Sequence, residues 1–278
     1  MEKKLDQKVA VITGAGGTLC SEMARNLALQ GAKVALLGRN IDSLKKVEQE
    51  ITTNGGTAIS VSVDVTNQKA MEKANIQIIE SLGACKILIN GAGGNQREAI
   101  TTSGEFSQKE IDDKNAGGFF NISMKKFMEV IETNTMGTVI PCFIFGKEMA
   151  KNGGGNIVNI ASMNSYRPLS NVAAYAMAKA GIVNFTQWLA TYLAPAKIRV
   201  NAIAPGFFLN GRSRKLLTTN NGFTERGERI IRQTPMRRFG EAPELMGCLN
   251  WLIDDQAAGF VTGITVPVDG GFLSDSGV

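Results

Sequence analysis

Short aliphatic and β-branched runs alternate with segments of helical length along the first 90 residues of the chain. The apolar runs cover residues 8–13, 33–38, 57–63 and 86–90, and amphipathic stretches separate them. Strands divided in this way pair in parallel, because a parallel pair needs a crossover connection that is usually a helix. The alternation therefore predicts the α/β class, with a doubly wound parallel sheet of the Rossmann type between two layers of helices.

The alternation resumes in the second half of the chain. The predicted elements are a helix at about 124–151, a strand at 155–162, a helix ending near residue 193, a strand at 197–206, a helix at about 242–254 and a strand at 263–271. Between the halves, a glycine-rich polar stretch at about 94–124 is too long for an ordinary loop. We interpret it as an insertion, either mobile or part of a site, within a single domain over residues 1–278.

The first predicted strand runs directly into TGAGGTLC, residues 13–20. Gly14, Gly16 and Gly17 would let the backbone turn tightly and face a phosphate at the N-terminus of the next helix. Glycines also end strands for structural reasons alone, but this position between a strand and a helix favours a dinucleotide site. Asp64, at the end of the third strand, is placed to accept a hydrogen bond from an adenine amino group.

The chain has no histidine, the side chain that ordinarily exchanges protons near neutral pH. Tyr175 and Lys179 stand four positions apart, which places both on one face of a helix. A neighbouring ammonium favours phenolate, so we expect the pKa of Tyr175 to fall below its usual value of about 10. The pair is a candidate for proton transfer, although a lone pair at this spacing is more often a helix-surface contact.

Together these motifs resemble the short-chain dehydrogenase/reductase family over essentially the whole chain. The family's glycine motif falls on residues 13–20, its Asn-Asn-Ala-Gly motif on residues 90–93 and its Pro-Gly pair on residues 205–206. The resemblance implies four catalytic residues: Asn134, Ser162, Tyr175 and Lys179. It also implies a larger set that binds a nicotinamide dinucleotide: Gly14, Gly17, Thr18, Leu19, Arg39, Asp64, Val65, Asn90, Ala92, Tyr175, Lys179, Pro205 and Gly206.

The family resemblance gives each catalytic residue a role. Tyr175 would pass a proton to or from a substrate oxygen, and Ser162 would hydrogen-bond that oxygen as it gains negative charge. Lys179 would also hold the nicotinamide ribose, and Asn134 would position a water that relays protons to Lys179. The hydride belongs to the cofactor. The resemblance further implies a homotetramer, with the C-terminal strand and tail at a subunit contact.

Thr18 and Cys20 stand where the family usually has glycine. Cys20 falls where the first helix packs against the sheet, so we expect a modest displacement of that helix and weaker pyrophosphate binding. The hydroxyl of Thr18 is expected to cap the helix.

The end of the second strand bears on the choice of cofactor. An acidic residue there would bind the ribose 2′-hydroxyl and repel a 2′-phosphate, but Gly38 stands in its place and Arg39 follows. This favours NADP(H). If Arg39 only stacks on adenine, NAD(H) is the alternative.

Basic residues are concentrated late in the chain. Residues 212–240 hold eight basic and two acidic side chains, whereas the whole chain has a net charge of +5. Such a segment suggests an anionic partner, since guanidinium pairs with carboxylate or phosphate through two hydrogen bonds. A solvated helix face is the alternative.

The insertion, the sequence APGFFLN and the tail are similar to one branch of the family, the D-mannonate oxidoreductases or fructuronate reductases. This branch acts on a sugar acid, and its substrate lid would fall at about 207–238. We expect Arg214 to contact the substrate carboxylate, with Asn95 and Arg97 of the insertion as weaker candidates. Asn210 replaces a threonine that the family has after its Pro-Gly pair. Arg237 and Arg238 are as well suited to pairing carboxylates within the fold.

Other functions stay open at this point. A gluconate 5-dehydrogenase or a 3-oxoacyl-carrier reductase would keep the same catalytic residues and differ in the lid. A binding module, for example for nucleic acid, fits less well because the basic segment lacks interleaved aromatic residues. The chain has no apolar run long enough to span a bilayer, and its four cysteines show no metal-ligand spacing. We therefore expect a cytoplasmic enzyme without a metal, a membrane partner or a nucleic-acid partner.

Overall fold

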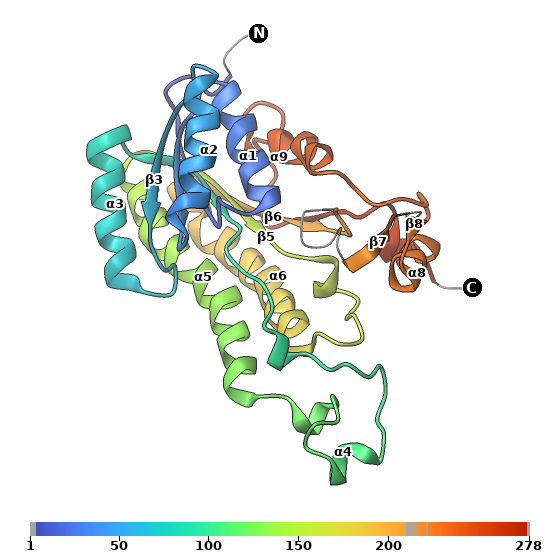
Figure 1. Cartoon of the computed structure of the whole chain (residues 1–278). Helices are drawn as coiled ribbons and strands as arrows, with labels where there is room; N and C mark the ends of the chain where they lie inside the picture. Colours follow the sequence, from blue (N-terminus) through green and yellow to red (C-terminus); the bar gives the residue numbers. More distant parts are fainter. Residues whose placement is uncertain (1–3, 210–213, 215, 221, 277–278) are drawn as a thin grey trace.

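The computed structural model describes residues 4–209, 214, 216–220 and 222–276. In this part of the chain seven strands form one parallel sheet in the order β3-β2-β1-β4-β5-β6-β9 (Figure 1). The strands are β1 (Val9–Thr13), β2 (Lys33–Gly38), β3 (Thr57–Ser62), β4 (Cys85–Asn90), β5 (Gly155–Ile160), β6 (Ile198–Pro205) and β9 (Thr265–Val268). The predicted doubly wound sheet is confirmed. Its strand order reverses between β1 and β4, where such sheets bind ligands beyond the carboxyl ends of their strands.

Two layers of helices cover the sheet. One face packs against α1 (Thr18–Leu29), α2 (Ile41–Thr53) and α9 (Met246–Ile253). The other face packs against α3 (Gln68–Leu82), α5 (Met124–Lys151) and α6 (Ala173–Leu193). The helix predicted at about 242–254 begins as a 3₁₀ turn, η5 (Ala242–Leu245), which Pro243 starts. Within the described ranges, no helix combines the length and the apolar character needed to cross a bilayer.

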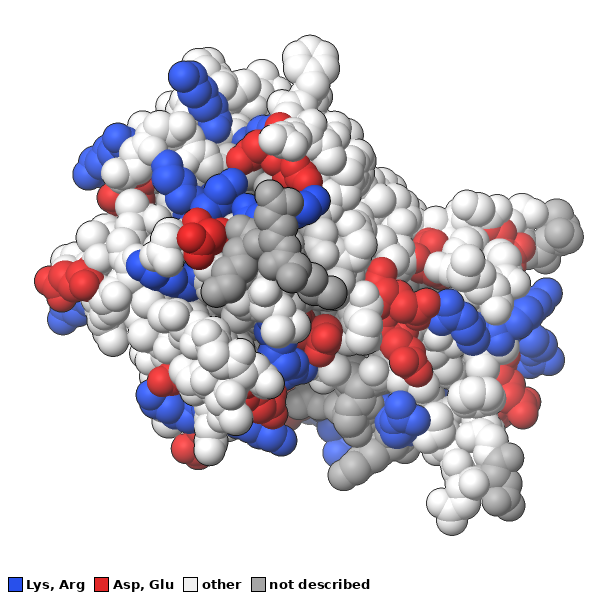
Figure 2. All heavy atoms as spheres, turned by 90° about the horizontal axis from the view of Figure 1, so that it is seen from above, with Lys and Arg blue, Asp and Glu red and all other residues white. Residues whose placement is uncertain are grey.

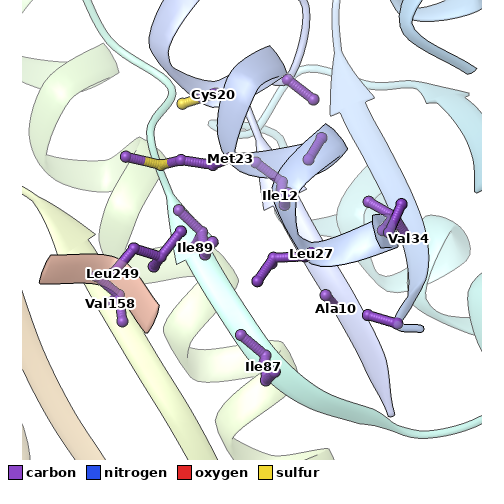
Figure 3. Close-up of a cluster of buried hydrophobic side chains, with 14 of the residues drawn as sticks. Ala10, Ile12, Cys20, Met23, Leu27, Val34, Ile87, Ile89, Val158 and Leu249 are labelled. Carbon is purple, nitrogen blue, oxygen red and sulfur yellow. The ribbon is translucent and has the colours of Figure 1, made fainter. Parts of the chain in front are cut away.

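The core between α1 and the sheet shows why these segments fold as they do. Met23 and Leu27 stand one helical turn apart on α1 and are fully buried against Ile12 of β1 and Ile89 of β4 (Figure 3). Leu249 of α9 closes the cluster from the side. Burying one such side chain stabilises the fold by roughly 1.5–3 kcal/mol. The helical spacing in α1 and the continuous apolar runs in the strands thus meet in one interior.

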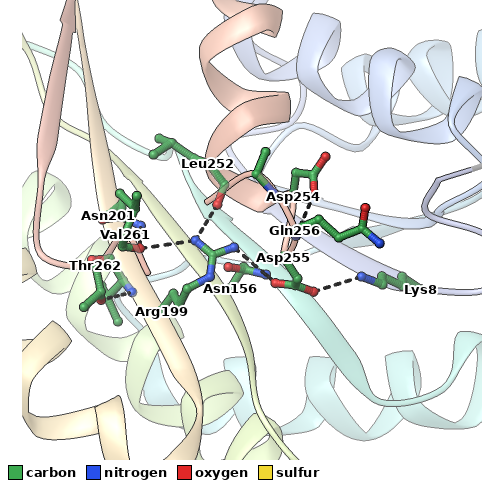
Figure 4. A network of polar contacts seen from close by, with 12 residues as sticks. Lys8, Asn156, Arg199, Asn201, Leu252, Asp254, Asp255, Gln256, Val261 and Thr262 are labelled. Atoms are coloured by element: carbon green, nitrogen blue, oxygen red, sulfur yellow. Dashed lines mark hydrogen bonds and ion pairs between the residues drawn. The ribbon is translucent and has the colours of Figure 1, made fainter. Parts of the chain in front are cut away.

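A polar network joins the amino ends of three strands to the end of α9 (Figure 4). Asp255 accepts hydrogen bonds from Lys8 at 3.2 Å, from Asn156 at 3.0 Å and from Arg199 at 3.1 Å. A second nitrogen of Arg199 donates to the carbonyl oxygen of Leu252 at 2.7 Å. The network therefore fastens the base of the sheet, at the end opposite the ligand crevice.

The described parts of the segments predicted as an insertion and a substrate lid extend from this body at the carboxyl side of the sheet (Figure 1). The insertion carries three short helices: η1 (Arg97–Ala99), α4 (Lys109–Asp112) and η2 (Phe119–Asn121). The lid carries a small hairpin of β7 (Thr218–Thr219) and β8 (Gly222–Phe223), followed by α8 (Glu225–Gln233). Thr224 caps α8 by accepting a hydrogen bond from the backbone of Gly227.

Candidate active site

A cleft of about 750 Å³ lies at the carboxyl ends of β1, β2, β3 and β4 and reaches α5 and α6. It collects most of the residues that the sequence singled out, from six separate segments of the chain. The predicted residues on its wall are Gly14, Gly17, Thr18, Leu19, Arg39, Asp64, Val65, Ala92, Asn134, Tyr175 and Lys179. Strand ends distant in sequence therefore build one site, as the switch-point rule requires.

The glycine loop packs directly on the loop that follows β4. Gly14 has φ +67°, and a Cβ built on it would lie 2.8 Å from the carbonyl oxygen of Gly91, so only glycine fits here. The hydroxyl of Thr13 accepts hydrogen bonds from the backbone nitrogens of Gly91 at 3.1 Å and Ala92 at 3.2 Å. These contacts bring the two loops together at the start of α1. The bare backbone there is a cradle that fits a pyrophosphate.

The cap of α1 differs from the prediction. Gly17 is the N-cap residue and makes no side-chain hydrogen bond, whereas Thr18 is the first helical residue. The carbonyl oxygen of Thr18 accepts a hydrogen bond from Ser21. The expectation that the hydroxyl of Thr18 caps the helix was wrong, because this hydroxyl lies one position too late. The first amide groups of α1 are thereby left without a side-chain cap, as a phosphate site at a helix N-terminus requires.

Cys20 is buried on α1 and contacts the loop after β4. A Cβ built on Gly91 would lie only 2.1 Å from the sulfur of Cys20. Burial raises the pKa of this thiol to about 11, and the nearby ammonium of Lys179 opposes that rise. The thiol is therefore protonated near neutral pH and packs as a small apolar side chain.

Tyr175 and Lys179 line the wall of the cleft, and Ser162 lies beside Tyr175 without lining the wall itself. The hydroxyl of Ser162 accepts a hydrogen bond from the backbone of Asn164 at 3.2 Å and lies near enough to the phenol of Tyr175 to influence its pKa. The Nζ of Lys179 lies 5.6 Å from the centre of the Tyr175 ring and donates to the carbonyl oxygen of Ile160 at 2.6 Å. The turn after β5, which carries Ser162, and α6, which carries Tyr175 and Lys179, thus meet at one point beside the wall.

The ionisation of this group corrects the sequence-based expectation. Burial raises the pKa of Tyr175, and the hydrogen bond from Ser162 opposes this only in part. Burial lowers the pKa of Lys179 to about 8, which weakens the positive charge that was expected to favour phenolate. The prediction that Lys179 lowers the pKa of Tyr175 was therefore wrong, because desolvation of both groups outweighs their attraction.

Asn134 fastens the start of the insertion. Its side chain accepts a hydrogen bond from the nitrogen of Gly94 at 3.1 Å and donates to the carbonyl oxygen of Gly94 at 2.7 Å and of Val130 at 2.8 Å. A Cβ built on Gly93 would lie 2.4 Å from the Oδ1 of Asn134 and 3.6 Å from the Nζ of Lys179. Asn134 therefore holds the loop beside Lys179, and both polar atoms of its side chain are engaged there.

Arg39 and Asp64 form the opposite end of the cleft. One oxygen of Asp64 accepts hydrogen bonds from the backbone nitrogen of Thr66 at 3.0 Å and from its hydroxyl at 2.8 Å. The backbone hydrogen bond from Thr66 is the main cause that lowers the pKa of Asp64, and Arg39 adds a smaller effect. Asp64 is thus ionised at neutral pH. Its other oxygen is suited to accept from an adenine amino group.

Three predicted cofactor residues lie away from this wall. The side chain of Asn90 points into a buried network with Asn159 rather than into the cleft. Pro205 and Gly206 end β6 beside β9, and the nitrogen of Gly206 donates to the carbonyl oxygen of Val268 at 2.9 Å. Their direct contact with a cofactor remains a prediction.

The predicted substrate residues lie on the insertion and the lid. The side chains of Asn95, Arg97 and Arg214 are exposed, and none of the three lines the cleft. Arg238 pairs with both oxygens of Glu244, at 2.6 and 2.7 Å, and lowers the pKa of that carboxyl to about 2. This confirms the prediction that Arg238 pairs with a carboxylate within the fold.

Other parts of the basic segment play different roles. Arg237 donates to the carbonyl oxygen of Arg232 rather than to a carboxylate. Asn210 lies outside the described residues, so the departure noted there stays a sequence observation.

Several site residues were missed by the sequence reasoning. Asn40 and Ser43 line the cleft, where Asn40 caps α2 by accepting from the nitrogen of Ser43 at 3.1 Å. A Cβ built on Gly16 would lie 2.2 Å from the hydroxyl oxygen of Ser43, so Gly16 is required for this contact. An Asn before a helical pattern is a capping signal that could have identified Asn40. The hydrogen bonds from Gly91 and Ala92 to the hydroxyl of Thr13 had no comparable signal in the sequence.

The fold and the cleft define a dinucleotide-binding oxidoreductase of the Rossmann class, with a Ser-Tyr-Lys group beside a phosphate-binding loop. Residues 8–221 match the family model described as short chain dehydrogenase. The chain therefore belongs to the short-chain dehydrogenase family, and it is an NAD(P)-dependent dehydrogenase or reductase.

Three relatives illustrate the family relationship. UxuB, an uncharacterized oxidoreductase of Bacillus subtilis, is 46% identical over 279 residues that cover 100% of this chain and 99% of the relative. The crystal structure of a proposed D-mannonate oxidoreductase from Haemophilus influenzae with bound NAD has a TM-score of 0.94 at 42% identity, covering 99% and 98% of the two chains. Gluconate 5-dehydrogenase of Gluconobacter oxydans is 30% identical over 94% of this chain and 93% of its own.

Proposed function

We propose that the protein interconverts the ketone and alcohol forms of a sugar acid, most specifically D-fructuronate and D-mannonate. The observation that carries the proposal is that Tyr175, with Ser162 beside it, stands next to Lys179 on the wall of the cleft that also contains the glycine loop. The basic lid supports an anionic substrate, since Arg214 is exposed on it. The similarity to a protein described as a D-mannonate oxidoreductase supports the particular sugar acid.

The residues of the site divide the chemistry among themselves. The bound dinucleotide supplies or accepts the hydride. The raised pKa keeps the phenol of Tyr175 protonated near neutral pH, which is the form that donates a proton to a carbonyl oxygen during reduction. The hydroxyl of Ser162 stabilises negative charge on that oxygen. Lys179 and Asn134 hold the wall and the adjoining loop in place.

We further propose that NADP(H) is the preferred cofactor. Gly38 leaves no carboxylate at the end of β2, and Arg39 lies on the cleft wall where a 2′-phosphate would be neutralised. Gly14, Gly17, Thr18 and Leu19 would hold the pyrophosphate at the start of α1. NAD(H) is the competing choice, because the Haemophilus relative carries NAD.

The test is a coupled comparison of cofactor and substrate. NADPH and NADH are supplied separately, and their absorbance is followed with D-fructuronate, 5-ketogluconate and an acetoacetyl thioester. The proposal predicts fastest consumption with D-fructuronate. Faster consumption with 5-ketogluconate would instead support a gluconate 5-dehydrogenase, for which the Gluconobacter relative is the evidence. No consumption with any carbonyl compound would overturn the proposed reaction.

The anionic substrate is tested on the lid. Arg214→Ala should raise KM for D-fructuronate about tenfold and leave KM for the cofactor unchanged, since a hydrogen bond to a charged group contributes about 1.5–3 kcal/mol. Arg226→Ala, which removes an exposed arginine from α8, is the matched control. An equal effect of both variants would indicate general electrostatic attraction only.

On the face shown in Figure 2 basic and acidic side chains are interspersed, which disfavours a nucleic-acid surface there.

We also propose that the enzyme is a homotetramer. Trp188 and Tyr192 of α6 are stacked at 5.2 Å and are 57% and 68% exposed. Phe143 of α5 is 62% exposed, so large apolar side chains stand on both neighbouring helices. Such exposed surface is typical of protein interfaces. Sedimentation equilibrium of the wild-type protein and of Trp188→Asp should give a tetramer and a smaller species, respectively.

A further inference from the structure

A chain of buried side-chain hydrogen bonds runs behind the cleft, from β4 through β5 to α6. The amide of Asn90 donates to the Oδ1 of Asn159 at 2.9 Å, and the amide of Asn159 donates to the hydroxyl of Thr186 at 2.9 Å. Thr186 donates in turn to the carbonyl oxygen of Ile182, one turn earlier on α6, at 2.7 Å. All three side chains are at most 1% exposed. Neither Asn159 nor Thr186 has a role in the site as described above.

The network ends on the same face of α6 that carries the reacting groups. Tyr175, Lys179, Ile182 and Thr186 follow the helical spacing of four, three and four residues, so their side chains share one face. Lys179 donates to the carbonyl oxygen of Ile160 on β5. The next residue back along β5 is Asn159, so adjacent residues of one strand bind α6 at two points. These points are seven residues, or about 10 Å, apart along the helix.

These two hydrogen bonds constrain the position of α6 more closely than the apolar packing around them does. The side chains between α6 and the sheet are largely apolar, and apolar contact is non-directional. A hydrogen bond fixes both distance and direction, and a buried amide left without its partner costs about 1–3 kcal/mol. The bond between Asn159 and Thr186 therefore resists rotation of α6 and its sliding along β5.

We propose that Asn159 and Thr186 are positioning residues, which set the rotation and axial placement of α6 and thereby the placement of Tyr175 and Lys179 in the cleft. The inference rests on the proposed oxidoreductase function, because it assigns these residues to the same reaction. Asn90 extends the link to the cofactor side. It stands opposite Asn159 in the sheet and directly precedes Gly91, whose backbone packs against the glycine loop.

The test compares three substitutions on α6. Thr186→Val keeps the shape of the side chain and removes the hydroxyl that accepts from Asn159. Thr186→Ser keeps the hydroxyl and serves as the rescue. Thr191→Val is the matched control, because Thr191 lies on the same helix and its hydroxyl bonds only a backbone carbonyl, that of Gln187.

Two readouts separate positioning from stability. The first is kcat with D-fructuronate, together with the Kd of NADPH from fluorescence titration. The second needs no turnover: the protein has three tyrosines, so ¹³C labelling at Cζ gives three resonances, which Tyr→Phe variants assign. We expect Thr186→Val to lower kcat at least tenfold with the Kd of NADPH within twofold of the wild type. The resonance of Tyr175 should shift, while those of Tyr166 and Tyr192 stay in place.

Thr186→Ser should restore both readouts, and Thr191→Val should change neither. A variant Thr186→Val that melts at a lower temperature but keeps the wild-type kcat and Tyr175 resonance would show a purely structural network and overturn the inference. If the wild type reduces none of the carbonyl compounds, the proposed function fails, and the resonance of Tyr175 alone decides whether the network positions α6. Thr186→Ala replaces Thr186→Val in the same comparison if the latter does not fold.

Discussion

The sulfur of Cys20 fills the space that a side chain on Gly91 would need, since a Cβ at Gly91 would lie 2.1 Å from it. Cys20 stands where the family usually has glycine, and Gly91 stands where its Asn-Asn-Ala-Gly motif has asparagine. The two departures are therefore complementary: the larger residue on α1 is matched by the smaller one on the loop.

The complementary sizes of Cys20 and Gly91 predict that substitutions at these two positions are coupled in their effect on stability. Gly91→Ala alone should destabilise the protein and weaken NADPH binding, because the new methyl group overlaps a buried sulfur. Adding Cys20→Gly should recover part of the loss, with a coupling free energy of about 0.5–3 kcal/mol in a double-mutant cycle of urea denaturation. Gly181→Ala is the control, since a Cβ there meets nothing within 4 Å and lies in a helix. Strict additivity of the two substitutions would contradict the complementarity.

Removal of the phenol should abolish most of the turnover. Tyr175→Phe is expected to lower kcat by about 10²–10⁴, the usual contribution of a positioned acid or base, and to leave the Kd of NADPH within a few-fold of the wild type. Tyr166→Phe is the matched control, because Tyr166 lies at the end of η3 (Met163–Ser165), outside α6, and is 50% exposed. Steady-state rates and fluorescence titrations measure the two effects. Equal rates for Tyr175→Phe and the wild type would refute the assigned role.

The buried ammonium predicts a pH-dependent stability. The pKa of Lys179 is about 8 in the folded protein, against 10.5 for an unperturbed lysine side chain, so the unfolded chain binds more protons between these values. Its contribution to stability is therefore present above about pH 10.5 and is lost as the pH falls to 8. Relative to Lys179→Met, the wild type should gain roughly 3 kcal/mol between pH 8 and 10.5.

The comparison with Lys179→Met also removes the effect of Cys142 and Cys248, whereas the pKa of Cys20 should rise further in the variant because it loses the opposing effect of Lys179. Burial raises the pKa of Cys20 and Cys248 to about 11 and of Cys142 to about 12 from 9.0, so stability falls above pH 9 in both proteins. Urea denaturation with a reductant present gives the difference at each pH. A difference that stays constant from pH 7 to 10 would contradict the lowered pKa of Lys179.

Arg39 should decide between the two cofactors. Arg39→Ala is expected to raise the Kd of NADPH at least tenfold and to change that of NADH less than twofold, because only NADPH carries the 2′-phosphate. Lys46→Ala removes an equal charge from the exposed face of α2 and tests for long-range attraction. Isothermal titration calorimetry provides both constants. If Arg39→Ala weakens both cofactors equally, Arg39 stacks on adenine and NAD(H) becomes the better assignment.

The network at the base of the sheet predicts a carboxylate effect far from the cleft. Asp255 is partly desolvated, but hydrogen bonds from Asn156, Arg199 and Lys8 outweigh this and lower its pKa. Asp255→Ala should cost about 1 kcal/mol of unfolding free energy at pH 7, a modest value because the carboxylate is 58% exposed. The difference in unfolding free energy between the wild type and the variant should shrink as the pH falls below 3.8. The carboxylate of Asp255 is then protonated in the unfolded chain and, at lower pH, in the folded protein as well. Asp112→Ala, which removes an exposed carboxylate from the segment at 94–124, is the control for a general change in net charge.

The sequence predicted the elements whose patterns are local and strong. The helices at 124–151 and through Tyr175 match α5 and α6 closely, because both segments are long, and Ser123 caps the start of α5. The lid hairpin and the short helices of the insertion were not predicted. Their segments are two to four residues long and carry no periodicity that a sequence can reveal.

The site was predictable to the extent that it follows from spacing. Tyr175 and Lys179 share a face because four residues make about one helical turn. Their pKa values were not predictable, since these depend on burial that arises only when α6 packs on β5. The same applies to Asn90, whose side chain faces Asn159 only because the two strands are paired in register.

The ionic link between Lys8 and Asp255 has a consequence for synthesis on the ribosome. Its partners are 247 positions apart, so the acidic residue emerges only after nearly all the strands have been made. Until then the first strand is held in the nascent chain by its pairing with β2 and β4 and by α1, which packs on it. Closure of the base of the sheet belongs to the last stage of folding, after the central strands have assembled.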